Sequence, residues 1–413
     1  MPDDDRRTDP RPVLSDARPA AGAHGPGSPT FLQELNRRAV FDELWRAPQS
    51  RSRLATSTGL SKPTVSSALA HLQRAGLVRR GGFTTGRAGP AAALYEPDPT
   101  AGFVVGVQLG GRLQAAVADL DGTVLARVKA PNRTRTPASL AAAVADLTAN
   151  AARGAGLSFA DASVVMVATP GVPDQPTRSV QRATLPGVDQ AGFLSELDAA
   201  LGTTCLVEND VNLAAVGEHR LGAARGVADF VLVSLRPGLG LSAFVDGRLH
   251  RGVHGAAGEV ALMSLIAAHP LDALIRRAAQ SPGEQLMLEE AVSSSGVVRL
   301  AHRFELTQLR TAREVYRAAH AGDRTAKRVV RIHAQQLALT VAAAGAVLDP
   351  DLIVISGVLD EAVSAHVQKA LRAVNALQPA FVMGHLGEEA VLLGAVAAAL
   401  PAAHERVFIR SLG

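Results

Sequence analysis

The stretch GLSKPTVSS at residues 59–67 decides how the N-terminal part of the chain folds. Gly59 supplies a tight turn, Ser61 is placed to cap a following helix, and apolar residues then recur at helical spacing: Val65, Ala68, Leu69 and Leu72. The other face of this helix begins with small polar residues and a lysine. A helix of this kind after a turn is typical of helix-turn-helix proteins, whose polar face meets phosphates and base edges of DNA.

The flanking sequence extends this pattern in both directions. Apolar spacing predicts helices at Phe31–Arg46 and at about Arg51–Thr58, and Gly76 is expected to end the third helix. Two short strands around a basic, glycine-rich tip then predict a winged helix-turn-helix over residues 29–97. The alternative for the tip is a flexible linker. Residues 1–28 lack the apolar segment of a signal peptide and predict a disordered tail.

The charge distribution indicates that the N-terminal module binds a polyanion. Residues 31–95 carry ten arginine and lysine residues against three acidic ones, a net charge of +7, while the whole chain carries +4. We therefore expect only this module to touch nucleic acid. The expected major-groove contacts are Ser61, Lys62, Thr64, Ser66 and Ser67, the expected phosphate contacts are Arg51 and Arg53, and Arg87 in the tip is expected to enter a minor groove.

Length and composition bound the rest of the chain. A length of 413 residues predicts two or more domains, and with 47% hydrophobic but only 3% aromatic residues the core must consist mainly of Ala, Val and Leu. A single cysteine, Cys205, excludes an intramolecular disulfide and indicates a reducing, cytoplasmic compartment. The apolar run Leu337–Leu348 is too short to cross a bilayer, so no membrane is expected.

Residues 98–413 predict an α/β body. Buried strands are expected at Phe103–Leu109, Leu113–Leu120, Thr123–Val128, Ser163–Ala168, Cys205–Glu208, Asp229–Leu235, Leu241–Val245 and Leu352–Ser356. Helical spacing appears at 136–154, after Asn212, over 313–348 and over 391–400. Two halves, each a β-meander followed by a helix, suggest a duplicated architecture of the sugar-kinase type.

Four segments together resemble the ROK family (repressors, open reading frames and sugar kinases) in its winged-helix repressor branch. They are the helix-turn-helix from Arg53 to Val78, the hairpin from Gly106 to Gly122, NDVNLAA at 209–215 and GAAGEV at 255–260. The resemblance implies an N-terminal winged helix followed by two actin-like lobes with a sugar cleft between them. By the same resemblance Asp210 matches a catalytic base that would be vestigial here, and Asn209, Glu259 and Glu289 match sugar ligands. The alternative is that Asn209 or Asp210 merely caps the helix at Leu213.

Departures from the family pattern argue against catalysis. Gln108 and Arg112 stand where family kinases have an acid and a threonine, and Pro237 removes a backbone donor from the second phosphate loop. Leu262 occupies the position of a zinc-binding histidine and no cysteine lies nearby, so no zinc and no cofactor are expected. The loop histidines His250, His254 and His269 are interpreted as surface residues.

Arg112 and Arg236 invite a further hypothesis. If both loops face the cleft, their guanidinium groups would suit the phosphate of a sugar phosphate. The alternative is that both are ordinary surface arginines in loops.

The sequence thus predicts a cytoplasmic, nucleoid-associated bacterial regulator, in the simplest case a repressor, of genes for sugar or amino-sugar use. Its expected partners are a double-stranded DNA operator and a sugar or sugar-phosphate effector, and its expected form is a homodimer or homotetramer. Two alternatives remain open: a bifunctional sugar kinase with a DNA-binding domain, and a dimeric DNA-binding regulator that needs no ligand.

Overall fold

The computed structural model describes most of the chain. The described residues are 28–83, 91–174, 176–236, 238–260, 291–357, 359, 361–374 and 380–412. The predicted N-terminal tail and the tip with Arg87 lie outside them, as do Pro237, Leu262, His269 and Glu289.

The N-terminal unit, residues 28–97, consists of three helices and a three-stranded antiparallel sheet in the order β1-β3-β2. Its elements are α1 (Pro29–Leu44), β1 (Gln49–Ser50), α2 (Arg51–Thr58), α3 (Lys62–Arg74), β2 (Val78–Phe83) and β3 (Ala93–Pro97). The predicted start of α3 is confirmed: Ser61 Oγ accepts a hydrogen bond from the backbone N–H of Thr64 at 3.3 Å. The four predicted apolar residues of α3 are all buried.

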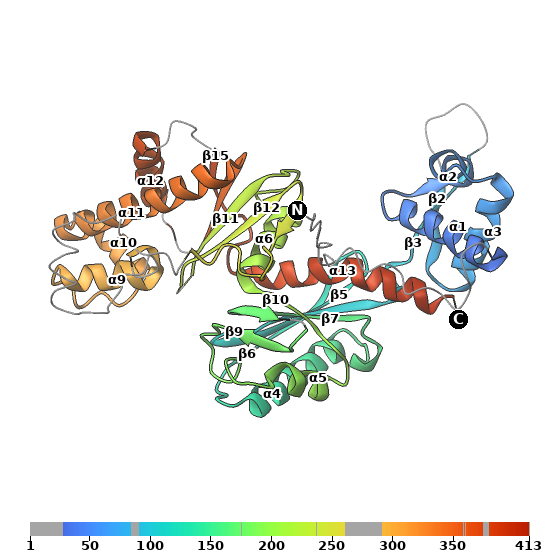
Figure 1. Cartoon of the computed structure of the whole chain (residues 1–413), viewed down its shortest axis with the longest axis horizontal. Coiled ribbons are helices and arrows are strands. Elements are labelled where there is room, and N and C mark those ends of the chain that lie inside the picture. Colours follow the sequence, from blue (N-terminus) through green and yellow to red (C-terminus); the bar gives the residue numbers. More distant parts are fainter. Residues whose placement is uncertain are drawn as a thin grey trace, which may run out of the picture.

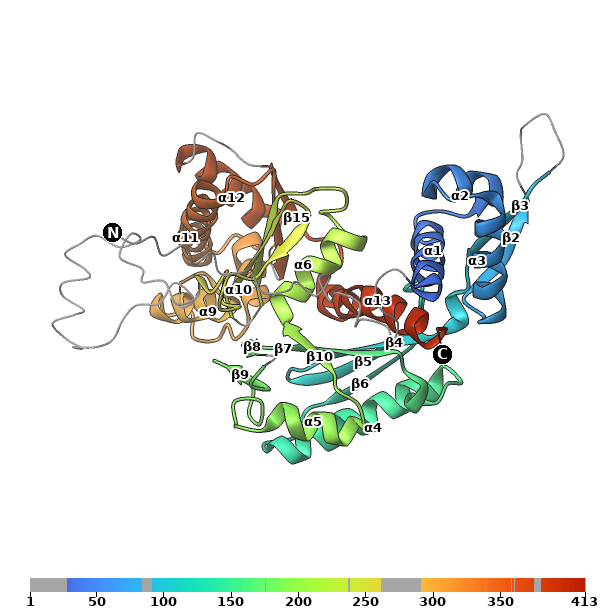
Figure 2. The same ribbon diagram turned by 45° about the vertical axis from the view of Figure 1, so that its right-hand side comes forward.

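The first lobe is built on a five-stranded sheet in the order β10-β7-β4-β5-β6. Its strands are β4 (Phe103–Gln108), β5 (Arg112–Asp119), β6 (Val124–Pro131), β7 (Val164–Thr169) and β10 (Leu206–Asn209), with a small ribbon of β8 (Val172–Asp174) and β9 (Ser179–Gln181). Helices α4 (Pro137–Gly154) and α5 (Phe193–Leu201) cover one face of the sheet (Figure 2). The predicted Asp121-Gly122 hairpin is present, with Gly122 at φ +84° between β5 and β6.

The second lobe has a sheet in the order β13-β12-β11-β14-β15. Its strands are β11 (Phe230–Leu235), β12 (Gly240–Val245), β13 (Arg248–His250), β14 (Leu352–Gly357) and β15 (Ala380–Met383). Its described outer helices are α9 (Ser294–Arg303), α10 (Ala312–His320), α11 (Arg324–Leu348) and α12 (Glu361–Val374). The predicted helix over 313–348 is therefore two helices, because Gly322 adopts φ +103° and Asp323 caps α11.

Of the described helices, α6 (Asp210–Leu221) and α13 (Ala390–Arg410) lie between the sheets. In Figure 1, α13 runs from α6 along the upper face of the first lobe to the N-terminal unit. One continuous apolar core joins all three parts, because residues of α1, α3, both sheets, α6 and α13 contact one another in it. The N-terminal unit is thus fixed to the body through shared core packing and does not hang from a linker.

The apolar composition of α13 follows from this central position. Residues 390–403 form a longer apolar run than Leu337–Leu348, which corrects the sequence-based expectation, and by length and composition alone the helix over 387–410 would span a membrane. Its apolar residues instead pack on the first sheet and on α6. The approach to β4 is close, since a Cβ added to Gly106 would lie 3.2 Å from the carbonyl oxygen of Leu392. Core packing therefore accounts for its hydrophobicity.

Candidate functional site

The candidate ligand site lies at the carboxyl ends of three parallel strands. β4 and β10 both pair in parallel with β7, and the register places Gln108 opposite Ala168 and Asn209 opposite Thr169. Ligands of open α/β sheets bind at this kind of edge. Gln108, which the sequence places in a phosphate loop, accepts a hydrogen bond from Nε2 of Gln114 at 3.2 Å.

Asn209 joins β10 to α6 and caps that helix. Its Oδ1 accepts hydrogen bonds from the backbone N–H groups of Val211 at 2.9 Å and Asn212 at 3.1 Å, and its Nδ2 donates to the carbonyl oxygen of Gly171 at 2.9 Å. The capping alternative is thus observed for Asn209. An amide Nδ2 carries two hydrogens, so capping leaves one donor for a ligand, and the predicted ligand contact stays a prediction.

Asp210 is the first residue of α6 and is partly buried. Burial raises the pKa of its carboxyl group to about 6; the Arg236 guanidinium and nearby backbone N–H groups oppose this rise, and the charge of Glu259 adds to it. Two of the acidic residues predicted from sequence therefore share one electrostatic environment. A partly buried carboxylate that titrates near neutrality is typical of functional sites.

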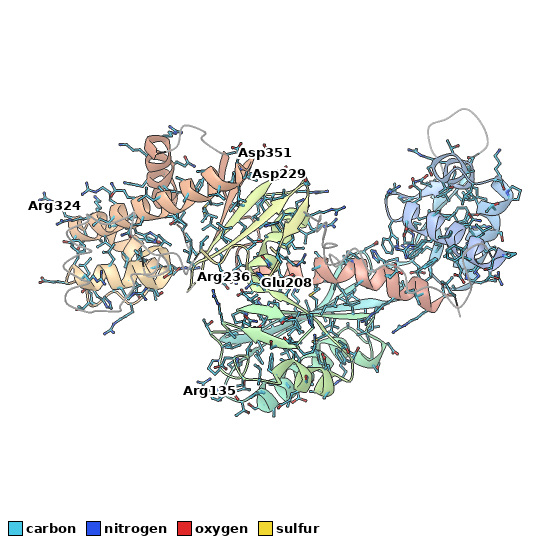
Figure 3. The ribbon with its side chains drawn as sticks, viewed as in Figure 1. Arg135, Glu208, Asp229, Arg236, Arg324 and Asp351 are labelled. Carbon is cyan, nitrogen blue, oxygen red and sulfur yellow. The ribbon has the colours of Figure 1, made fainter. Side chains whose placement is uncertain are left out.

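Arg236 follows β11 and faces the same site. Burial lowers the pKa of its guanidinium, whereas the charges of Asp210 and Glu388 act in the opposite direction. Its Nη2 donates to the carbonyl oxygen of Gly387 at 3.3 Å. Figure 3 shows Arg236 and Glu208 where the two lobes meet. Arg112, the other predicted phosphate ligand, is exposed at the start of β5.

Glu208 is a residue of this site that sequence reasoning missed. It is only 5% exposed, its Oε2 lies 2.6 Å from Nε of Arg251, and its Oε1 accepts from the backbone N–H of Asn209 and from Nδ2 of Asn212. Arg251 begins the loop that leads to Glu259, so this ion pair joins the β10–α6 junction to the loop of the second lobe. The sequence carried one sign of this role: Glu208 is a single charged residue in an otherwise apolar predicted strand.

A close helix crossing connects the site to α13. A Cβ added to Gly394 would lie 1.7 Å from the carbonyl oxygen of Leu213, and one added to Gly217 would lie 2.4 Å from that of Ala390. Only glycine allows α6 and α13 to approach so closely. Glu218 of α6, fully buried, also accepts backbone hydrogen bonds from Ala223, His385 and Leu386, which lie on both sides of the crossing.

The other end of α13 holds the N-terminal unit. Phe408 stacks on Phe41 of α1 with ring centroids 5.4 Å apart, and the His404 ring stacks on Trp45 at 3.7 Å. Glu405 forms an ion pair with Arg38, whose guanidinium also lies over the Phe408 ring. The same helix therefore contacts the candidate ligand site and the N-terminal unit.

The described residues predicted to contact DNA lie at the surface of the N-terminal unit. Ser61, Lys62 and Ser67 are exposed at the start of α3, while Thr64 and Ser66 are partly exposed. Arg53 is exposed on α2. Arg51 is also exposed, but its guanidinium donates to the hydroxyl of Tyr95 at 2.9 and 2.7 Å. These assignments stay predictions, and Arg87 lies outside the described residues.

The sequence predicts no metal site. Within the described ranges, no group of three or more His, Cys, Asp or Glu side chains is arranged to hold a metal ion. Residues 261–290, which include the position of the family's zinc site, are not among them.

Comparison with known proteins identifies the family. The bifunctional enzyme NanE/NanK of Brucella melitensis is 35% identical over 208 residues, which are 48% of this chain and 36% of that enzyme. The chain thus spans about a third of that relative. The transcriptional dual regulator NagC of Escherichia coli is 25% identical over 343 residues, covering 81% of this chain and 83% of that protein.

A solved structure agrees with the fold. The crystal structure of a ROK family transcriptional regulator, a homologue of the E. coli MLC protein, superposes with a TM-score of 0.74 at 21% identity and covers 92% of this chain and 99% of that one. The sequence profile of the ROK family matches residues 104–401, which include both lobes and the candidate site. The chain therefore belongs to the ROK family.

Proposed function

We propose that this protein is a sugar-responsive, DNA-binding transcriptional regulator, in the simplest case a repressor. The observation that carries the proposal is the position of α13, which contacts the helix of the candidate sugar site at one end and the N-terminal unit at the other. A ligand that changes how the lobes pack around α6 would reposition a DNA-reading unit through a single helix.

In this proposal the N-terminal unit acts as a winged helix-turn-helix, and α3 enters the major groove. Lys62 and Arg53 support it because both are exposed and neither forms an ion pair with a described residue. Arg51 is oriented by Tyr95, which suits a phosphate contact of fixed geometry. The names of relatives, an N-acetylglucosamine repressor and a xylose repressor, agree with a regulator of sugar genes.

The effector is proposed to be a sugar or sugar phosphate. Asn209, Asp210 and Glu259 would hold its hydroxyl groups, and Arg236 is placed to meet a phosphate. The protein would act in the cytoplasm as a homodimer or homotetramer whose DNA-binding units read two half-sites.

The test combines site mapping with matched substitutions. Genome-wide mapping of bound DNA supplies an operator, and fluorescence anisotropy then measures its affinity for wild type, Lys62→Ala and the control Lys369→Ala, an exposed lysine of α12. We expect Lys62→Ala to weaken binding by roughly tenfold, the scale of one lost charged contact, with a smaller salt dependence, and Lys369→Ala to match wild type. Equal affinities for all three proteins would refute the assignment of α3.

One observation favours a second candidate, a sugar kinase. A carboxyl group with a pKa of about 6 suits a general base near neutral pH. The absence of an acid at Gln108 speaks against it, since phosphoryl transfer relies on metal-assisted charge neutralisation. Turnover of ATP with any hexose, lost in Asp210→Asn, would favour the kinase.

A further inference from the structure

The second lobe contains a basic segment far from the N-terminal unit. Residues 299–331 carry nine arginine and lysine residues against three acidic ones, a net charge of +6. Net positive charge is therefore not confined to residues 31–95; acidic residues elsewhere in the chain hide this segment in the overall sum. The segment forms the second half of α9, all of α10 and the start of α11.

A cavity of about 560 Å³ opens beside these helices. Its floor is formed by the buried side chains of Tyr316, Ala319 and Val330, and His366 of α12 lines its far side. This volume lies within the range of small-molecule sites, and a floor with one aromatic ring and two apolar side chains suits the organic part of a ligand.

Four cations surround the floor: Arg324, Lys327, Arg328 and Arg331 of α11. Their spacing of three, four and seven residues places them on one side of the helix. All four are exposed, and none is in an ion pair with a described carboxylate; Arg328 lies over the Phe304 ring at 5.0 Å. The neighbouring Asp323 is engaged as the cap of α11, where its Oδ1 accepts from the N–H of Ala326 at 2.8 Å.

Like charges at this spacing destabilise a helix, so the cluster lowers stability unless an anion binds it. Guanidinium groups bind phosphate oxygens in pairs, and several around one cavity suit more than one phosphate. We propose that this cavity binds a compact small molecule carrying two or more phosphate groups. It is a second ligand site, separate from the candidate site at Asp210.

Position and charge favour this occupant over DNA or a second copy. In Figure 1 the outer end of α11 and the N-terminal unit lie at opposite ends of the molecule, and Arg324 is labelled at that outer end in Figure 3. A duplex read by α3 of the same protomer is therefore remote from the cavity. A second copy docking by the same face would bring two segments of net charge +6 together.

Isothermal titration calorimetry of the full chain tests the proposal with inorganic pyrophosphate, a hexose bisphosphate and a hexose monophosphate at constant ionic strength. We expect both double-phosphate probes to bind at least tenfold more tightly than the monophosphate. Lys327→Glu and Arg331→Glu should each weaken this binding at least tenfold. Arg303→Glu, an exposed residue of α9 outside the cavity lining, should leave it unchanged. Unfolding midpoints confirm that each variant is folded.

Three results would overturn the proposal: no binding of either double-phosphate probe, equal binding of sulfate, or equal weakening by Arg303→Glu. If Lys327→Glu instead weakens operator binding as much as Lys62→Ala does and leaves pyrophosphate binding intact, the cluster is a DNA contact and the proposal is wrong. The calorimetric readout needs no DNA, so a failure of the proposed regulatory function is distinguishable from a failure of this site.

Discussion

Replacing Asp210 by Asn should stabilise the folded protein more at neutral pH than at acidic pH. Burial of the carboxyl group raises its pKa from 3.8 to about 6 in the folded protein. Well below pH 3.8 the group is protonated in both the folded and unfolded states and contributes nothing. As pH rises from 4 to 6 the unfolded state loses this proton first, so wild-type stability falls across that window relative to the Asn variant.

The size of the effect follows from the shift. About two pKa units correspond to about 3 kcal/mol at most. Asp210 is only partly buried, so we expect water to reduce the difference to about 1–2 kcal/mol. The substitution leaves the cap of α6 in place, because Asn209 already supplies it.

The assay is chemical denaturation of wild type and Asp210→Asn at pH 4 and pH 7.5. At each pH we take the free energy of unfolding of Asp210→Asn minus that of wild type. This difference should be about 1–2 kcal/mol larger at pH 7.5 than at pH 4. Asp198→Asn is the control: its carboxylate lies 2.6 Å from Nη2 of Arg178 and accepts from the N–H of Cys205, so its loss should destabilise the protein at pH 7.5. A pH-independent difference for Asp210→Asn would refute the reasoning.

Three further predictions concern the packing of α13 on α6, the packing of α13 on α1, and the N-cap of α3. Gly394→Val should lower the free energy of unfolding by more than about 3 kcal/mol in denaturant titrations, since even a Cβ would lie 1.7 Å from a backbone oxygen, whereas Gly110→Ala, with no atom closer than 3.6 Å, should cost below about 1 kcal/mol. Phe408→Ala removes the stack on Phe41, so amide hydrogen exchange should become faster in α1 and stay unchanged in the first lobe. An equal increase in exchange in both regions would contradict this. Ser61→Ala should cost about 1 kcal/mol through loss of the α3 cap, and Ser61→Gly only a few tenths, so equal costs would argue against capping.

Sequence reasoning succeeded where one local rule decides the structure. The start of α3 follows from Ser61 as a cap and from four apolar residues on one face, and both features act within a few residues. The Asp121-Gly122 hairpin is similar, because its positive φ requires glycine. The residues NDVN likewise marked the junction of β10 and α6.

The remaining features depend on contacts between distant segments. The Glu208–Arg251 ion pair joins residues 43 positions apart, and the stacking of Trp45 on His404 joins the two ends of the chain. Neither pair carries a local signal, since an arginine in a loop or a histidine in a helix has many ordinary uses. The spacing of three and four residues between the basic residues of α11 is visible in the sequence. The net charge of the whole body does not show it, because acidic residues elsewhere offset these charges.

Under the proposed function, the construction of α13 would couple the candidate ligand site to the N-terminal unit without locking the two together. Gly394 fixes one half of the helix against α6, and Phe408 fixes the other half against α1. Pro401 lies between these contacts and donates no backbone hydrogen bond, so α13 lacks one main-chain hydrogen bond at this point. A shift of α6 can then be passed on as a change in direction of the second half of α13. The same 21-residue helix without a proline inside it, about 30 Å long, would carry this shift only by moving as a whole.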